Sequence, residues 1–408
     1  MKDLLILGAG TGGTMVANKL RKDLGPDWAI TLVDRDDVHV YQPGLLFLPF
    51  GDYSVSDIVK PRRRFVPPGV DLVLGELDRV DLEAQAVSLV DGRRLTYDYM
   101  VLATGSRIVP GETEGLEGAL GQGVADFYTL DGARKLAALL ESFEGGRLLV
   151  HTAAMPIKCP VAPLEFAFLA DAYLTRRGIR DKTELVYVTP LDGPFTKPKA
   201  SAKLAEMFER RSILVEPDFS VESYDGENKL LKGYDGRELP YDLVATIPVH
   251  SGSQALQDSG LTDETGWVPT QKFTLQSKAC ERVFVIGDAT DLPASKAGSV
   301  AHFQAEVLVP NLLAAIEGKP LKPVFDGHAN CFIETGFGKA ILIDFNYETE
   351  PLPGKFPLPG LGPFDLLSES YVNHWGKLGF KWAYWNLLLK GEELPIDHRM
   401  LMAGKRSS

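Results

Sequence analysis

The chain has 408 residues and a formal net charge of -12 at pH 7. This length predicts two domains plus an appendage rather than one core. The excess of acidic residues argues against a nucleic-acid partner, because phosphate binding needs clustered Lys and Arg side chains.

Three cysteines without a CxxC or metal-ligand spacing exclude a disulfide scaffold and indicate no metal site. The N-terminus lacks the pattern of a secretory signal, so we expect synthesis and folding in the cytoplasm. No stretch reaches the ~18 to 20 apolar residues that span a bilayer. The basic cluster at residues 62–64 is interpreted as a solvated turn after Pro61, with an anion or headgroup contact as the alternative.

The first predicted element is a strand over residues 4–7 that runs directly into a glycine-rich turn. A helical pattern over residues 14–24 and a second apolar strand over residues 30–33 follow. This order is typical of a dinucleotide-binding unit, whose glycines admit a pyrophosphate and whose strand-terminal acid binds a ribose. The expected ligands here are Gly8, Gly10, Thr11, Gly12, Gly13, Asp34, Arg35, Gln42 and Leu77.

Two later strand ends extend this to a flavoprotein prediction. They are Ala103-Thr104-Gly105 and Gly287-Asp288. Both resemble signatures of the flavoprotein superfamily with two dinucleotide-binding domains. The resemblance implies FAD as cofactor, an Ala-Thr-Gly turn close to it, and Asp288 as the ligand of its ribityl chain.

In relatives that use NADH, the inserted domain opens with its own strand and glycine loop. Here the corresponding strand over residues 147–151 is followed by no glycine before Gly178. The backbone therefore lacks the freedom to wrap a pyrophosphate, and we expect a reductant other than a nicotinamide. A type II NADH dehydrogenase stays an alternative.

A cysteine stands where that glycine loop would be. Cys159 precedes an amphipathic pattern over residues 164–174 that predicts a helix capped by Gly178. The helix dipole and Lys158 favour a thiolate at Cys159, with an inert buried cysteine as the alternative. Glu165 is a candidate proton carrier, although the dipole favours an acid in the first turn anyway.

The second candidate thiol is Cys331, 172 residues further on. Five ordered segments, at residues 41–43, 158–163, 291–296, 327–336 and 384–391, resemble the sulfide:quinone oxidoreductase family. The likeness covers nearly the whole chain. It implies that Cys159 and Cys331 form a redox disulfide, which hydrosulfide opens by exchange, and that FAD passes two electrons to a membrane quinone.

The resemblance also implies finer roles. It assigns the persulfide to Cys331 and the flavin-facing thiolate to Cys159. It places Lys296 near the flavin, where a cation stabilises the reduced ring, with an exposed lysine as the alternative. The cysteine that binds flavin covalently in some members is absent near Tyr128, so we expect non-covalent FAD.

Other reactive side chains are interpreted as structural. They are Cys280, His151, His250 and His302, which have no redox, triad or metal spacing. Two rival functions stay open: a soluble flavoprotein that passes electrons from sulfide to a cytochrome subunit, and a non-catalytic module that senses persulfide.

The last predicted element is an amphipathic helix over residues 378–390. Its apolar face consists of Leu378, Trp382, Trp385 and Leu389, broadened by Phe380, Tyr384, Leu387 and Leu388. Aromatic rings beside Lys377, Lys381 and Lys390 suit a headgroup boundary. We expect this face to rest on a membrane, on its cytoplasmic side, with packing on the core or in a homo-oligomer as the alternative.

Together these features predict an α/β fold with two Rossmann-like dinucleotide-binding domains and a C-terminal membrane-associating extension. The expected FAD-binding domain is split between residues 1–105 and 245–320. The second domain covers residues 106–244, and residues 321–408 carry Cys331 and the amphipathic helix. The expected partners are sulfide, a quinone and a membrane surface, while the sulfur acceptor is not identified.

Overall fold

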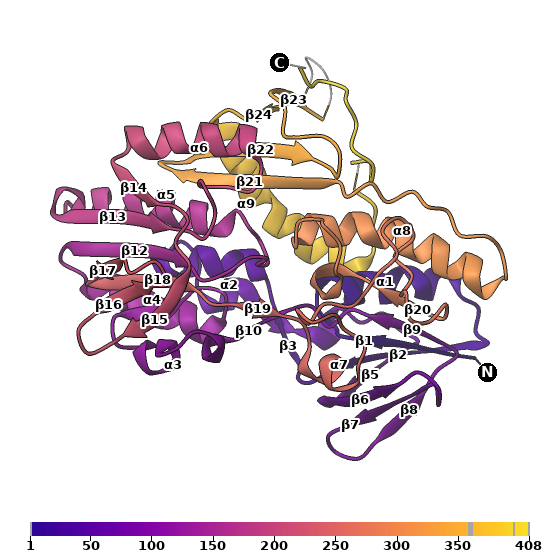
Figure 1. Ribbon diagram of the computed structural model, residues 1–408. Coiled ribbons are helices and arrows are strands. Elements are labelled where there is room, and N and C mark those ends of the chain that lie inside the picture. The colour runs from indigo at the N-terminus through magenta and orange to yellow at the C-terminus, as the bar shows by residue number, and fades with distance from the viewer. Residues whose placement is uncertain (1, 358–361, 395, 407–408) are drawn as a thin grey trace.

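Two five-stranded parallel sheets form the frame of the protein (Figure 1). The computed structural model describes residues 2–357, 362–394 and 396–406. The first sheet has the order β20-β9-β1-β2-β5, with β1 (Lys2–Leu7), β2 (Trp28–Asp34), β5 (Val70–Leu74), β9 (Tyr99–Leu102) and β20 (Val283–Val285). The second has the order β11-β18-β12-β13-β14, with β11 (Val124–Asp126), β12 (Gly146–Thr152), β13 (Thr183–Val188), β14 (Ile213–Glu216) and β18 (Leu243–Ile247). The predicted α/β class with two Rossmann-like units is confirmed.

The first sheet is covered on both faces, which explains its uninterrupted apolar strands. In β1, Leu4 and Ile6 pack in one cluster with residues of α1 (Thr11–Asp23) and α8 (Gly298–Ile316). Leu5 and Leu7 point the other way, into a cluster formed with a three-stranded meander. The meander consists of β6 (Leu77–Asp81), β7 (Ala86–Leu89) and β8 (Arg94–Thr96).

The second sheet carries α4 (Leu130–Ser142), α5 (Ala162–Arg176) and α6 (Pro198–Arg210), and a meander of β15 (Val221–Asp225), β16 (Leu230–Gly233) and β17 (Glu238–Pro240). Because β18 pairs with β12, the expected domain boundary at residue 245 falls inside a strand of this unit. The chain passes between the two units through the paired strands β10 (Arg107–Ile108) and β19 (His250–Ser251).

An antiparallel pair and a long helix dominate the C-terminal region. The sheet has the order β21-β22-β24-β23, with β21 (Ala329–Gly336), β22 (Lys339–Phe345), β23 (Gly354–Phe356) and β24 (Phe364–Leu366). Helix α9 (Tyr371–Asn386), yellow in Figure 1, packs against β21 and β22 and leads into η7 (Leu388–Lys390), which contacts α1. Shorter elements are β3 (Val38–Val40), β4 (Val59–Pro61), α2 (Val55–Ile58), α3 (Leu116–Ala119) and α7 (Gln254–Asp258).

Helix α8 is the one described helix long and apolar enough to cross a membrane by length and composition. From the sequence we expected no such segment. Most of α8 is buried, and it packs against α1 and β21. The core helix of a folded domain has the same length and composition, so these two properties are weak grounds for a membrane span.

The outward face predicted for α9 is wrong at Trp385 and Leu389, whereas Trp382 is exposed as predicted. Trp385, expected at the membrane, is 4% exposed and stacks on Phe65, and Leu389 is fully buried. Trp382 points to solvent at 63% exposure, and so does Trp375, which lies before the predicted helix, at 69%. The sequence offers two apolar sides on this helix, and contacts with a distant segment decide which side is covered.

Candidate functional site

The turn after β1 is shaped for the close approach of a phosphate group. Gly8 has a φ of +103°, and a side chain there or at Gly13 would collide with backbone atoms of Ala103 or of Gly8. A Cβ atom on Gly10 would meet nothing within 4 Å, so the space above it is open. Helix α1 begins at Thr11 and directs its free amide groups at this space. These features fit the pyrophosphate of a dinucleotide.

The acid at the end of β2 is held by an arginine that the sequence interpretation misplaced. Asp34 accepts a hydrogen bond from the Ala9 amide at 2.7 Å and pairs with Arg62 Nη1 at 3.1 Å. Arg62 also donates to the Ala9 carbonyl at 2.7 Å. The interpretation of Arg62 as part of a solvated turn is therefore wrong, although its neighbour Arg63 does pair with Asp37 on the surface. Burial raises the pKa of Asp34, and the Arg62 charge acts against the rise.

The two flavoprotein signatures meet at the carboxyl ends of β9 and β20. The Ser106 hydroxyl donates to Asp288 at 3.3 Å, and the Gly287 amide donates to Gln304 at 2.6 Å. The buried Thr104 hydroxyl has no hydrogen-bond partner in the described part of the chain. Buried hydroxyl groups normally have one, so Thr104 fits a cofactor atom as its partner.

Lys296 is buried beside this junction, which rules out the alternative of an exposed lysine. Its Nζ donates to the carbonyl oxygens of Asp288 and Thr290, both at 2.8 Å, and lies 3.7 Å from the centre of the Trp267 ring. Burial lowers the pKa of Lys296 to about 8. A lysine with this pKa is still mostly cationic at neutral pH.

Three expected ligands lie elsewhere. The Arg35 side chain is exposed and pairs with Asp36 at 3.3 Å. Gln42 is exposed at the start of η1 (Gln42–Leu46), and Leu77 packs against the cluster under the first meander. Their roles as cofactor ligands stay predictions.

Cys159 lies in the loop between β12 and α5, in a backbone conformation that glycine usually provides. Its φ is +49°. Three backbone hydrogen bonds hold it: its amide donates to Lys296 at 2.6 Å, and its carbonyl accepts from the Ala162 amide at 2.9 Å and from the Tyr128 hydroxyl at 3.3 Å. The loop is thereby fastened to the cofactor side of the first unit.

Cys331 comes from β21 and lies in the same hydrophobic cluster as Cys159. Both are free thiols. The charges of Glu165 and Lys377 shift the pKa of each thiol, and Cys331 also contributes to the pKa shift of Cys159. The structure thus brings together two thiols 172 residues apart in the chain.

The expectation of a favoured thiolate at Cys159 is wrong for this state. Burial, followed by the charge of Glu165, raises the pKa of Cys159 far above its ordinary value, and the same two causes raise that of Cys331 to about 12. Lys377 acts against both shifts, as the Ser295 hydroxyl does for Cys331. The sequence showed the helix dipole and Lys158 but not the buried acid.

A buried ion pair lies next to the thiols. Glu165, on the first turn of α5, pairs with Lys377 of α9 and accepts a hydrogen bond from the Glu334 amide at 2.8 Å. Burial lowers the pKa of Lys377, but the charges of Glu165, Glu334 and Cys159 outweigh it and leave that pKa raised. Lys377, expected at a lipid headgroup boundary, instead points into the protein.

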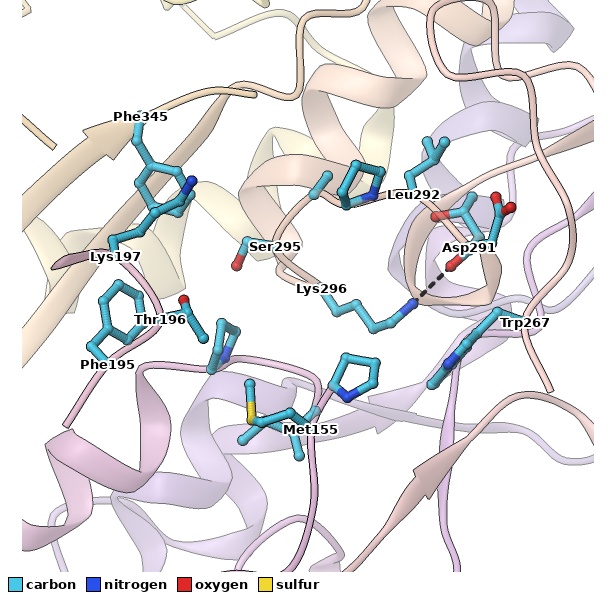
Figure 2. Close-up of a pocket in the computed structure, with 16 residues that line it drawn as sticks. Met155, Phe195, Thr196, Lys197, Trp267, Asp291, Leu292, Ser295, Lys296 and Phe345 are labelled. Carbon is cyan, nitrogen blue, oxygen red and sulfur yellow. Dashed lines mark hydrogen bonds between the residues drawn. The ribbon is translucent and has the colours of Figure 1, made fainter. Parts of the chain in front are cut away.

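A cavity of ≈ 320 Å³ opens beside the cysteine loop (Figure 2). Figure 2 shows Lys197 and Phe345 at one end and Trp267 at the other, with Ser295 and Lys296 between them. The remaining lining residues include Met155, Pro156, Ile157, Pro160, Phe195, Thr196, Asp291 and Leu292. Ser295, whose hydroxyl acts to lower the pKa of Cys331, is thus among the lining residues.

The remaining candidates have structural surroundings. His151 bonds to Tyr224 at 2.6 Å, His250 bonds to the Pro248 carbonyl at 2.9 Å, and His302 lies 3.8 Å from Glu306. Cys280 packs at the edge of the cluster beneath the first sheet. Within the described ranges no group of three or more His, Cys, Asp or Glu side chains could hold a metal ion.

Comparison with known proteins identifies the family. Residues 2–305 match the pyridine nucleotide-disulphide oxidoreductase family. The chain is 31% identical over 395 residues to the mitochondrial sulfide:quinone oxidoreductase of Dictyostelium discoideum, covering 95% of this chain and 86% of that relative. The chain belongs to the sulfide:quinone oxidoreductase family.

Other members agree with this assignment. The mitochondrial sulfide:quinone oxidoreductase of Mus musculus is 26% identical over 398 residues, covering 95% of this chain and 86% of the relative. The solved sulfide:quinone oxidoreductase from Aquifex aeolicus shares the fold, with a TM-score of 0.80 at 20% identity over 96% of this chain and 92% of that one. The protein is an FAD-binding oxidoreductase of this family, and the phosphate loop, Asp34 and the Thr104 hydroxyl fit that cofactor.

Sequence reasoning missed several residues that surround this candidate site. Arg62 stood in a basic cluster near Asp34, a signal that could have suggested a buried pair. Lys377 was expected at the headgroup boundary just before the predicted membrane helix. Tyr384, whose hydroxyl bonds to Thr11 at 2.8 Å and to His39 at 2.7 Å, was assigned to the outward face of that helix. Nothing in the sequence indicates that α9 turns these side chains inward.

Proposed function

We propose that this protein oxidises sulfide through Cys159 and Cys331 and passes the electrons to a quinone, as a sulfide:quinone oxidoreductase. The observation that carries the proposal is a cysteine at φ +49° in the loop after β12, with the second thiol near enough to act on its pKa. A nucleotide-binding loop would have glycine there. The site is thus built for sulfur chemistry at the position where relatives bind a nicotinamide.

The proposed cycle starts from a Cys159–Cys331 disulfide. Hydrosulfide attacks the sulfur of Cys331, forming a persulfide there and releasing the Cys159 thiolate. A thiol- or sulfite-class nucleophile then takes the outer sulfur and leaves a second thiolate. Re-forming the disulfide from the two thiolates releases two electrons. FAD, held non-covalently by the glycine turn, Asp34 and Asp288, would supply the chemistry that accepts these two electrons and passes them to a quinone.

The neighbouring charges suit these steps. The leaving Cys159 thiolate is anionic, and Lys377 is the cation whose charge lowers the pKa of this thiol. Lys296, fixed by two carbonyl oxygens beside Asp288, offers a positive charge on the cofactor side. Glu165 can hold or release a proton near both sulfurs because burial raises its pKa.

The cavity next to the loop gives the sulfur chemistry its own access route. It is bounded by residues 155–157 on one side and by Ser295 and Lys296 on the other, so a small anion inside it lies next to the loop that carries Cys159. Lys197 and Lys296 at its walls favour hydrosulfide and an anionic sulfur acceptor.

Membrane contact is proposed on the side of α9 opposite its buried face. Tyr371, Trp375 and Trp382 are exposed there, and Phe337 of the β21–β22 turn is exposed as well. Exposed aromatic rings suit the interface between lipid and water. A peripheral position on the cytoplasmic face of a membrane would give the protein access to a lipid-soluble quinone.

Anaerobic reduction of the flavin tests the function. Sulfide should bleach the oxidised flavin band of the wild-type protein, and an added quinone should restore it. Cys159→Ser and Cys331→Ser should retain FAD but lose sulfide-driven bleaching by orders of magnitude, on the order of the loss seen for removed nucleophiles. Cys280→Ser is the matched control and should behave as wild type. Full activity in either active-site variant would refute the assigned roles.

The same assay separates the rival functions. Bleaching by NADH instead of sulfide would establish a type II NADH dehydrogenase, whereas no bleaching by either donor would favour a persulfide-sensing module. Reoxidation by a cytochrome but not by quinone would indicate a cytochrome-coupled enzyme.

A further inference from the structure

The proposed reaction consumes more protons than it releases, so the protein must take up protons from solvent. Hydrosulfide yields zero-valent sulfur, one proton and two electrons, and a quinone takes up two electrons and two protons to become a quinol. The sum of HS⁻, quinone and one proton gives sulfur and quinol. Each turnover therefore draws one net proton from solvent, and the ion pair next to the thiols is buried, so the proton needs a path.

The inner end of a path is the Glu165–Lys377 pair. Both side chains are deeply buried, and Lys377 Nζ also donates to the Phe332 carbonyl at 3.2 Å. The Glu165 carboxylate accepts the Glu334 amide, which fixes the pair against β21. Lys377 pairs with Glu165, and the charges of both Glu165 and Glu334 raise its pKa.

The outer end is a second pair, formed by Glu334 and by His374 of the same helix as Lys377. Glu334 is 1% exposed, and both of its carboxylate oxygens lie within hydrogen-bond distance of His374 Nδ1, at 3.0 and 2.9 Å. His374 is three residues before Lys377 on α9, so the two side chains share one face of the helix. The His374 imidazole is partly exposed to solvent.

We propose that His374 and Glu334 are the outer half of a proton path that connects solvent to the Glu165–Lys377 pair. His374 takes a proton from water and gives it to the Glu334 carboxylate. When Lys377 or Glu165 has given up a proton to the reaction, Lys377 takes a replacement proton from Glu334. This inference rests on the proposed function, because only a proton-consuming acceptor requires such a path.

The charges around His374 are consistent with this task. The groups that face it are Glu334 from β21, Asp52 from the loop after η2 (Leu48–Phe50) and Lys377 from α9. The hydrogen bond to Glu334 raises the pKa of His374, against the effects of burial and of Lys377. Farther out, burial raises the pKa of Asp52, and the charge of Arg176 acts against this rise. Burial, followed by the charge of Glu334, raises the pKa of Tyr53. The imidazole thus keeps its proton to a higher pH than an ordinary histidine does.

The test separates the two halves of the reaction in the detergent-solubilised holoenzyme. Sulfide first reduces the flavin without oxygen, and a soluble short-chain ubiquinone then reoxidises it in a stopped-flow instrument between pH 6 and 9. His374→Gln should slow reoxidation at least about tenfold, a modest loss for a proton-transfer group. Added imidazole should restore the rate by replacing the missing carrier. A pH indicator should show proton uptake slowed to the same extent.

The matched control is His398→Gln, which replaces another partly exposed histidine near an acid, Asp397 at 3.6 Å, and should behave as wild type. Reoxidation of His374→Gln within about twofold of wild type, or a slow rate that imidazole does not restore, would overturn the path. Proton uptake at the wild-type rate would do the same. Failure of the wild-type protein to be bleached by sulfide would instead sink the proposed function.

Discussion

Cys159 is held in its conformation by its surroundings rather than by its own preference. A residue with a Cβ atom strains the backbone at φ +49°, and such residues persist where several contacts over-determine them. The three backbone hydrogen bonds to Lys296, Ala162 and Tyr128 provide these contacts. These contacts hold the backbone in its strained conformation and thereby fix the position of the sulfur.

This strain predicts an order of stability among variants that all lack the thiol. Cys159→Gly should be more stable to urea than Cys159→Ala by about 1 kcal/mol, because only glycine adopts this conformation without cost. The same two changes at Cys331, in the extended strand β21, should give the opposite order, since glycine weakens a strand interior. Equal stability of the two Cys159 variants would show that the backbone is unstrained.

Thiol chemistry at this site shows where residue-level prediction stops. The sequence placed Cys159 at a helix start beside a lysine, and both features favour a thiolate. Burial and the charge of Glu165 reverse that expectation, and Glu165 itself is balanced by Lys377, 212 residues away in the chain. A local pattern contains no information on burial or on such distant charges.

At the scale of elements, α9 has two apolar sides with different tasks. The inner side carries Tyr384 and Trp385, which pack on His39, Tyr41 and Phe65 near the phosphate loop. The outer side carries Trp375 and Trp382 into solvent. A helical repeat identifies both sides as apolar but does not rank them.

The two sides predict separable effects of tryptophan replacement. The double variant Trp375→Gln and Trp382→Gln should lose most binding to phospholipid vesicles in a co-sedimentation assay while its melting temperature stays unchanged. Trp385→Ala should cost about 3 to 5 kcal/mol of stability, because it empties a buried site. Tyr234→Gln, at an exposed position on the second meander, is the control for general loss of surface aromatics. Vesicle binding that survives the double variant would reject α9 as the membrane contact.

At the scale of the whole molecule, the site is assembled from three parts of the chain. The first unit provides the loop around Asp288 and Lys296, the second provides Cys159 and Glu165, and the C-terminal region provides Cys331 and Lys377. The β10–β19 crossing and the hydrogen bond between Cys159 and Lys296 link the first two units. A disulfide between the cysteines would close a loop that contains parts of the second unit, of the first unit and of the C-terminal region.

Closing that loop should stabilise the protein measurably. For the 172 residues between the cysteines, the loss of loop entropy in the unfolded chain predicts a gain on the order of 5 kcal/mol. The denaturant midpoint of the oxidised protein should therefore exceed that of the protein reduced by a phosphine. Cys280→Ser should keep this difference and Cys331→Ser should abolish it. An unchanged midpoint in the wild type would indicate that the two thiols do not pair.

The sequence by itself determined the features that depend on neighbours along the chain. The glycine turn after β1, the terminal acid Asp34, the helix before Gly178 and the cysteine in place of a nucleotide loop all follow from local backbone freedom and from the repeat of apolar residues. The family resemblance added the pairing of Cys159 with Cys331. Only the tertiary structure decided that Arg62 holds Asp34, that Lys377 points inward to Glu165, and which side of α9 is covered. These outcomes depend on burial and on charges brought together from separate segments, which lie 28 residues apart for Asp34 and Arg62 and 212 residues apart for Glu165 and Lys377, and neither quantity can be read from a local pattern.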